Sequence, residues 1–210
     1  LTDTDITDRI AASAGKLTGK NILEIGPGVG TLTRSLLFAG ATHVYAIEID
    51  LMCLEVLKGL QKIAPDHLTV INQDAKRFDE ETLPKPLKII ANLPYNIATE
   101  LILKWLSKPQ LFESITIMIQ KEVAERIVAQ PSTGAYGRLS IFCQLICETE
   151  LHFDVEPHHF FPPPKVTSSV ITLKPRPQLL YECDLKQLEN ITQLLFSQRR
   201  KMIRATLKNR

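Results

Sequence analysis

The chain of 210 residues is 44% hydrophobic and 23% charged, a composition typical of a folded globular protein that excludes disordered and fibrous classes. Its formal net charge of +2 conceals an asymmetry, because six of its 25 Lys and Arg residues lie between Arg199 and Arg210, where no acid occurs. The other residues carry 19 basic and 23 acidic groups, so a weakly acidic body precedes a basic end.

Several protein classes are excluded by simple patterns. No apolar run approaches the roughly 20 residues of a membrane span, and the first residues do not resemble a signal peptide. Cys143 and Cys147 are four residues apart, which predicts two buried thiols on one helix face. The adjacent His158 and His159 cannot share a helix face, so we expect no metal site. We expect a monomeric, cytoplasmic protein that does not bind membranes.

Short apolar runs alternate with helical patterns, which predicts a parallel sheet with crossover helices. The expected strands cover residues 21–25, 43–47, 68–71, 87–91 and 114–119. The expected helices cover residues 5–14, 31–39, 51–60, 97–106, 121–129 and 139–147.

The end of this region changes character. Residues 151–155 and 168–173 resemble strands joined by a turn-rich segment without a helix, so we expect them to be antiparallel neighbours. This layout predicts the class I methyltransferase fold, a Rossmann-like, mostly parallel, seven-stranded sheet with a late antiparallel strand. Pro175 and Pro177 mark a predicted boundary between a catalytic domain, 1–175, and a basic helical appendix, 176–210, with a helix over 184–208.

A glycine-rich loop follows the first expected strand. Gly26, Gly28 and Gly30 allow the backbone to turn sharply and to approach a ligand closely. A dinucleotide site would require its third glycine where this chain has Thr31. Glu24 completes instead the E-x-G-x-G form that is common where S-adenosylmethionine binds.

Two acids follow the next two strands. Glu48 lies 22 residues after Gly26, close to the spacing expected of an acid that binds ribose hydroxyls. Asp74 could accept a hydrogen bond from the adenine amino group of the same cofactor. A single acid is usually a solvated strand end or a helix cap. The glycine loop, Glu48 and Asp74, however, follow three successive strands. Together they favour a methyl-donor site, because open α/β sheets bind ligands at the carboxyl ends of their strands.

The fourth strand ends in Asn92-Leu93-Pro94-Tyr95. Asn and Pro are ordinary turn residues, so a plain turn is one interpretation. The functional interpretation starts from a nucleobase amine, whose lone pair is delocalised into the ring. The Asn92 side-chain oxygen and the Leu93 carbonyl could accept its two N–H groups and direct the lone pair at a methyl group. Tyr95 could then stack on the base, and positioning would provide most of the rate.

Five ordered motifs identify a family. They are Asn92-Leu-Pro-Tyr-Asn-Ile, Gln120-Lys-Glu-Val-Ala-Glu-Arg126, Tyr136-Gly-Arg-Leu-Ser140, Phe160-Phe-Pro-Pro-Pro-Lys-Val-Thr-Ser168 and Gln198-Arg-Arg-Lys201. Together they resemble the ribosomal RNA adenine dimethyltransferases, in particular the bacterial members of small-subunit assembly, over essentially the whole chain. The resemblance implies methyl transfer from S-adenosylmethionine to the N6 amino groups of two adjacent adenosines near the 3′ end of small-subunit rRNA, in the immature small ribosomal subunit.

The resemblance also implies roles for individual residues. The cofactor site would contain Gly26, Gly28, Glu48, Ile49, Asp74, Ala75 and Asn92. The catalytic motif would be Asn92, Leu93, Pro94 and Tyr95, with Phe160 as a second stacking aromatic. A core phenylalanine at a strand boundary is the alternative interpretation, and it stays open for Phe161 but not for Phe160. A flipped adenine held between Tyr95 and Phe160 would meet the needs of chemistry on a base.

RNA contact is predicted mainly for the basic end. Arg199, Arg200, Lys201 and Arg204 are clustered without acids, and such groups provide affinity for phosphates without reading sequence. Arg138 and Lys165 are further phosphate-binding candidates, expected beside the predicted pocket. The chain begins after the family's G-Q-N-F-L-like segment and ends before its last helices, so we expect the catalytic domain and only the start of the appendix.

Three alternatives remain open from the sequence. A macrolide-resistance relative would methylate large-subunit RNA, although Tyr136-Gly-Arg-Leu-Ser140 and the run of three prolines favour the assembly enzyme. A non-catalytic assembly or transcription factor could use the same fold, although Glu48, Asn92 and Tyr95 argue against an inactive relative. A small-molecule methyltransferase would have no use for the basic end.

Overall fold

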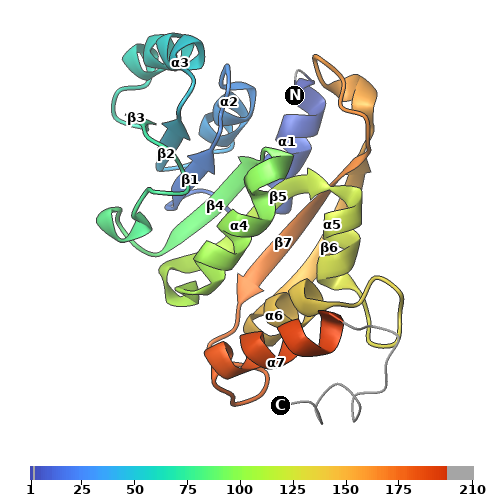
Figure 1. Ribbon diagram of the computed structural model, residues 1–210. Coiled ribbons are helices and arrows are strands. Elements are labelled where there is room, and N and C mark those ends of the chain that lie inside the picture. Colours follow the sequence, from blue (N-terminus) through green and yellow to red (C-terminus); the bar gives the residue numbers. More distant parts are fainter. Residues whose placement is uncertain (2, 198–210) are drawn as a thin grey trace.

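A seven-stranded sheet organises the molecule, in the order β3-β2-β1-β4-β5-β7-β6 (Figure 1). The computed structural model describes residue 1 and residues 3–197. The strands are β1 (Asn21–Ile25), β2 (His43–Glu48), β3 (Leu68–Asn72), β4 (Leu87–Asn92), β5 (Phe112–Gln120), β6 (Cys147–Val155) and β7 (Ser168–Pro175). The α-helices are α1 (Thr4–Ser13), α2 (Thr31–Phe38), α3 (Leu51–Ile63), α4 (Tyr95–Leu106), α5 (Lys121–Val128), α6 (Arg138–Ile146) and α7 (Leu185–Ser197).

The first five strands are parallel, whereas β7 lies antiparallel to both β5 and β6. This arrangement confirms the predicted fold class and the predicted antiparallel pair. The strand order also places β1 and β4 side by side in the middle of the sheet, although 61 residues separate the end of one from the start of the other. The loops that follow these two strands therefore meet at one edge.

Successive side chains of each strand point to opposite faces of the sheet, so the strands contribute to two separate hydrophobic cores, one on each face. Leu87, Ile89 and Ala91 of β4 pack in the core that α4, α5 and α6 cover, while Ile90 packs in the core of α1 and α2. Ile22 and Leu23 of β1 divide in the same way. Because both faces of the sheet are covered, β4 and β5 are buried along nearly their whole length, as parallel strands in such sheets usually are.

One prediction about the second half of the chain is wrong. Cys143 and Cys147 are both buried, but they do not share a helix, because α6 ends at Ile146 and Cys147 begins β6. The strand is four residues longer at its start than predicted. It lies at the edge of the sheet, where Glu148 and Glu150 are tolerated beside solvent, so its first residues lack an apolar signature.

The last helix begins where the sequence predicts it. Helix α7 runs from Leu185 to Ser197, and the predicted remainder up to residue 208 lies outside the described residues. The division into 1–175 and 176–210 stays a prediction. Within the part of the chain that the structure describes, no helix is long and apolar enough to cross a bilayer.

Candidate functional site

The residues singled out in the sequence gather at one edge of the sheet, at the carboxyl ends of β1, β2, β3 and β4. The glycine loop follows β1, Glu48 is the last residue of β2, Asp74 lies two residues beyond β3, and Asn92 ends β4. Residues of four strands therefore converge from positions that span about 70 residues of sequence. This edge is where α/β sheets bind ligands.

The glycine loop has the backbone conformation that its residue type permits. Gly26, Gly28 and Gly30 have φ values of +63°, +58° and +80°, in the left-handed region that costs other residues energy. The Gly26 amide donates to the Ile47 carbonyl at 2.9 Å, which ties the loop to β2. A side chain at Gly26 would lie 3.8 Å from Cδ of Pro94, so the loop directly adjoins the motif at the end of β4.

Glu48 organises the neighbouring backbone. Its Oε2 accepts the amide of Gly28 at 3.0 Å, and its Oε1 accepts the amides of Ile49 and Asp50 at 2.8 and 2.9 Å. The residue is 8% exposed, so these bonds fix the carboxylate between the two loops. A carboxylate has about four acceptor positions. One or more positions therefore remain for hydroxyl groups of a ligand.

The turn after β3 carries the second acid. Asp74 Oδ1 accepts the amide of Lys76 at 2.9 Å, and the Asp74 carbonyl accepts the amides of Arg77 and Phe78. Ala75 is buried in this turn, next to the partly exposed Asp74. A small apolar residue and an acid are thus held together beside the end of β3, an arrangement that suits an aromatic ring with an exocyclic amine.

The motif at the end of β4 presents unused acceptors. No described residue forms a hydrogen bond with the side chain of Asn92, which is partly exposed at the edge. Leu93 is buried, and its amide donates to the Met118 carbonyl at 3.0 Å, which fixes the motif against β5. Pro94 has no backbone N–H to donate, and α4 begins immediately afterwards at Tyr95.

Tyr95 is held by a residue far away in sequence. Its hydroxyl lies 2.7 Å from Oγ of Ser168, the fully buried first residue of β7. This bond fixes the ring at the start of α4 beside the motif. The sequence contained Ser168 within the Phe160–Ser168 motif, but its partner could be identified only once β7 was known to lie beside β5.

The two adjacent phenylalanines differ in burial. Phe160 is partly buried and packs against the core that includes Val155 and Val170, whereas Phe161 is 84% exposed. From the sequence, the core interpretation stays open for Phe161 and is rejected for Phe160, yet it is Phe160 that packs against the core. The short helix Pro157–His159 turns Phe160 toward the sheet, and His159 Nδ1 lies 2.7 Å from Oδ2 of Asp3 at the start of α1.

Glu24 is the most unusual acid of the site. It is 1% exposed, Thr33 Oγ1 donates to its Oε2 at 2.6 Å, and its Oε1 has no partner among the described residues. Burial, opposed by the Thr33 bond and assisted by the charge of Glu48, raises the pKa of Glu24 to about 8. This carboxyl is therefore largely protonated at neutral pH, which the sequence motif alone did not indicate.

The predicted phosphate-binding residues fall into three places. Lys165 is exposed in the loop before β7, three residues from the partner of Tyr95. Arg138 begins α6 and lines a cavity together with Thr99 of α4, and its guanidinium lies 3.7 Å from Glu189 of α7. Arg199, Arg200, Lys201 and Arg204 lie outside the described residues.

Among the described residues, no group of three or more His, Cys, Asp or Glu side chains could hold a metal ion.

The strand order, the late antiparallel strand and the site at this edge define a class I methyltransferase fold. The chain matches the family described as ribosomal RNA adenine dimethylase over residues 1–210. It is also 46% identical to ribosomal RNA small subunit methyltransferase A of Allorhizobium ampelinum, over 99% of this chain and 77% of that protein. The protein of the same name in Xanthobacter autotrophicus is 48% identical, over 100% of this chain and 74% of that protein. The chain belongs to the ribosomal RNA adenine dimethylase family.

Solved structures agree with this assignment. A dimethyladenosine transferase from Plasmodium falciparum has a TM-score of 0.89 and 33% identity, over 100% of this chain and 74% of that chain. The 23S rRNA methyltransferase ErmE has a TM-score of 0.79 and 30% identity, over 100% of this chain and 84% of that chain. The name of the second structure specifies 23S rRNA, whereas the two curated relatives are named for the small subunit, so the shared fold alone does not select between these substrates.

Proposed function

We propose that this protein transfers methyl groups from S-adenosylmethionine to the N6 amino groups of two adjacent adenosines near the 3′ end of small-subunit rRNA. The observation that carries the proposal is the close approach of the glycine loop to the Asn92–Tyr95 motif, where a Cβ atom at Gly26 would lie 3.8 Å from Cδ of Pro94. This proximity supports the proposal, because a methyl donor bound at the glycine loop would lie next to two acceptors that suit an amine.

The donor site would use both backbone and side chains. Gly26 and Gly28 would allow the methionine portion to approach the backbone closely, and Glu48 would accept from the ribose hydroxyls. Ile49 and Ala75 would flank the adenine ring, and Asp74 would accept from its amino group. S-Adenosylmethionine, when bound, supplies a methyl group on a positively charged sulfur. The neutral thioether that remains after transfer is an excellent leaving group. The site therefore needs to position the reactants rather than activate the donor.

The target amine would bind against Asn92. Its two N–H groups would donate to Oδ1 of Asn92 and to the carbonyl of Leu93, while Tyr95 and Phe160 stack on the flipped base. These two acceptors would direct the nitrogen lone pair at the methyl carbon. The electron pair of the broken sulfur–carbon bond would leave with the sulfur, and the amine would lose one proton to water. Repetition of this transfer at the same nitrogen would give dimethyladenosine.

Binding of RNA would depend on the basic end of the chain. The body carries an excess of acids, so phosphate contacts would come from Arg199, Arg200, Lys201 and Arg204, with Lys165 and Arg138 contributing nearer the site. A catalytic unit over 1–175 and an RNA-contacting unit from 176 onward would divide these tasks in a monomer that works on immature small subunits in the cytoplasm.

Reversing the charges of Arg199 and Arg200 should weaken RNA binding and spare donor binding. Equal loss of both would contradict this assignment.

The decisive experiment is transfer of labelled methyl groups to immature small ribosomal subunits, followed by nucleoside analysis. We expect labelled N6,N6-dimethyladenosine, with two adjacent modified positions near the 3′ end in a primer-extension map. Label in large-subunit RNA alone would indicate the macrolide-resistance activity instead. Tight RNA binding without any transfer would indicate a non-catalytic assembly factor.

A further inference from the structure

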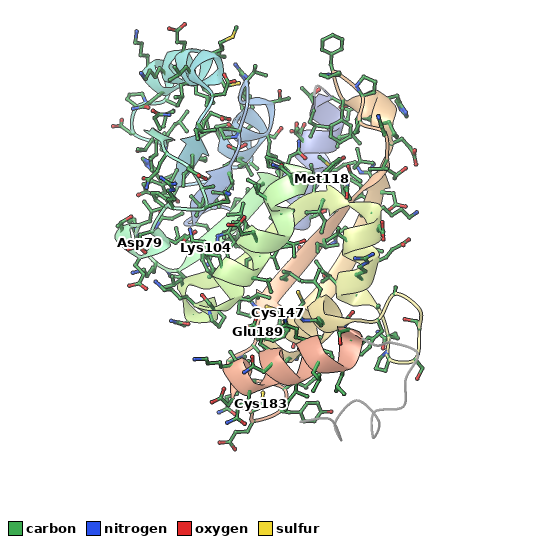
Figure 2. All side chains as sticks on the ribbon, viewed as in Figure 1. Asp79, Lys104, Met118, Cys147, Cys183 and Glu189 are labelled. Atoms are coloured by element: carbon green, nitrogen blue, oxygen red, sulfur yellow. The ribbon has the colours of Figure 1, made fainter. Side chains whose placement is uncertain are left out.

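A second cluster of polar groups lies behind the site, between α4 and the segment that follows β3. Lys104 of α4 points into this segment, near Asp79 (Figure 2). Its Nζ donates to the carbonyl of Ala75 at 3.0 Å, to the carbonyl of Phe78, and to Oε1 of Glu80 at 2.9 Å. An ammonium has three protons, so its donors are fully used.

Glu80 completes the cluster from the opposite side. It is 5% exposed, and its Oε1 also accepts the indole N–H of Trp105 at 2.9 Å. Trp105 is 1% exposed and anchors α4 in the core. A carboxylate this deeply buried is costly unless charged and hydrogen-bonded partners compensate it. Lys104 and Trp105 supply that compensation, so the three side chains form one unit.

The position of this unit suits a role in the donor site. Ala75 and Phe78 belong to the turn that Asp74 opens, and Lys104 holds the carbonyls of both. The same helix begins at Tyr95, directly after the Asn92 motif, so about 13 Å of rigid helix separates the two ends. The helix thereby connects the turn beside the expected adenine of the donor with the motif beside the expected target amine.

We infer that Lys104, together with Glu80 and Trp105, is a positioning unit of the donor site: it holds the 74–78 turn at a fixed place on α4 so that Asp74 and Ala75 face the adenine of the methyl donor. The inference rests on the proposed function. Lys104 acts through the turn and touches no reactant, so its loss should weaken donor binding much more than it slows transfer at saturating donor.

The chain offers a matched control. Lys108 lies four residues after Lys104 and pairs with Glu81 of the same segment, but its side chain is 48% exposed and it bonds to no carbonyl of the turn. Lys108→Met therefore removes the same kind of side chain and an ion pair between the same two regions, without releasing Ala75 or Phe78.

The test uses the full chain and compares Lys104→Met with Lys108→Met, well below the melting temperature of either. Titration calorimetry with S-adenosylmethionine should show a Kd about tenfold higher for Lys104→Met and nearly unchanged for Lys108→Met. In transfer assays KM for the donor should rise by a similar factor, with kcat within about twofold. Amides 75–79 should also exchange hydrogen faster in Lys104→Met, in the absence of any ligand.

The outcomes separate the two proposals. Normal donor affinity in a folded Lys104→Met variant would overturn the positioning role and leave the proposed function intact. A fall in kcat at saturating donor with KM unchanged would also overturn it. Failure of the unmutated protein to bind S-adenosylmethionine would overturn both proposals. Should Lys104→Met fail to fold, Glu80→Gln replaces it. This variant keeps an acceptor for Trp105 and loses the charge, so a Kd raised about threefold is expected, and an unchanged Kd would overturn the role.

Discussion

The two halves of the ligand-binding edge differ in how they are held together. On the half formed by β1, β2 and β3, carboxylates accept the amides of residues nearby in sequence, as when Glu48 accepts the amides of Ile49 and Asp50, one and two residues away. On the half formed by β4 and β7, contacts join distant residues, as when Tyr95 bonds to Ser168, 73 residues away. Bonds to nearby backbone amides thus contribute much of the order of the first half, whereas the second half depends on the return of β7.

The halves also differ in which polar groups are already bonded. Glu48 has three backbone donors, so the first half holds its shape whether or not a ligand binds. The side chain of Asn92 has no partner among the described residues, so the second half offers an acceptor that a substrate must complete. This difference implies that changes in the first half should act on affinity for the donor, and changes in the second on the rate of transfer.

The largest expected effect is on the rate. Asn92→Ala removes an acceptor for the target amine, and we expect kcat to fall by about 10³-fold because positioned polar groups of this kind are worth that much. RNA affinity should remain near that of the unmutated protein. The measurement is single-turnover transfer of labelled methyl groups, with a filter-binding assay for RNA. A rate of transfer reduced only a few-fold would show that the Leu93 carbonyl and stacking on the base are enough to position the target amine without Asn92.

The next effect is on affinity. Glu48→Ala leaves the amides of Gly28, Ile49 and Asp50 without their acceptor, so the loops should separate and the Kd for S-adenosylmethionine should rise about 100-fold. Titration calorimetry measures this directly. Asp50→Ala is the control, because Asp50 caps α3 through Met52 and Cys53 and leaves the Glu48 bonds intact. Equal losses of donor affinity in the two variants would mean that the weaker binding comes from a disturbed α3 and not from the bonds of Glu48.

The difference between the halves also explains what the sequence could predict. The expected strands 21–25 and 43–47 match β1 and β2 to within one residue, and Glu48 lies at the end of β2, as predicted. These features depend on short-range periodicity and on a fixed strand–loop–helix geometry. Sequence alone also placed Asn92 at the end of β4.

The remaining features depend on contacts between distant parts of the chain. The Ser168 partner of Tyr95 and the cluster of Lys104, Glu80 and Trp105 require knowledge of which elements are neighbours. The start of β6 at Cys147 was missed because an edge strand needs no continuous apolar run. The different burial of Phe160 and Phe161 follows from the short helix before them, which sequence patterns did not predict.

A smaller effect concerns pH and the first half. Because burial raises the pKa of Glu24 to about 8, the folded protein keeps a proton between pH 4.5 and 8 that the unfolded chain has already lost. The free energy of unfolding should therefore fall as pH rises through this window, by up to about 1 kcal/mol per pH unit, and level off above it. Glu24→Gln keeps an acceptor for Thr33 and should reduce this slope. Urea unfolding at pH 5 to 9 tests the prediction, and parallel curves for both proteins would contradict it.

The smallest effect probes the long-range contact of the second half. Tyr95→Phe removes the bond to Ser168 and keeps the aromatic ring, so we expect a loss of about 1 kcal/mol in transition-state stabilisation, or roughly fivefold in kcat, with donor affinity unchanged. Ser168→Ala removes the same bond from the other side, and single-turnover rates should fall by a similar factor. The double variant should then lose no more than either single variant, because the two groups share one interaction. Additive losses would mean that the hydroxyl and Ser168 act separately, and that the return of β7 does not position Tyr95.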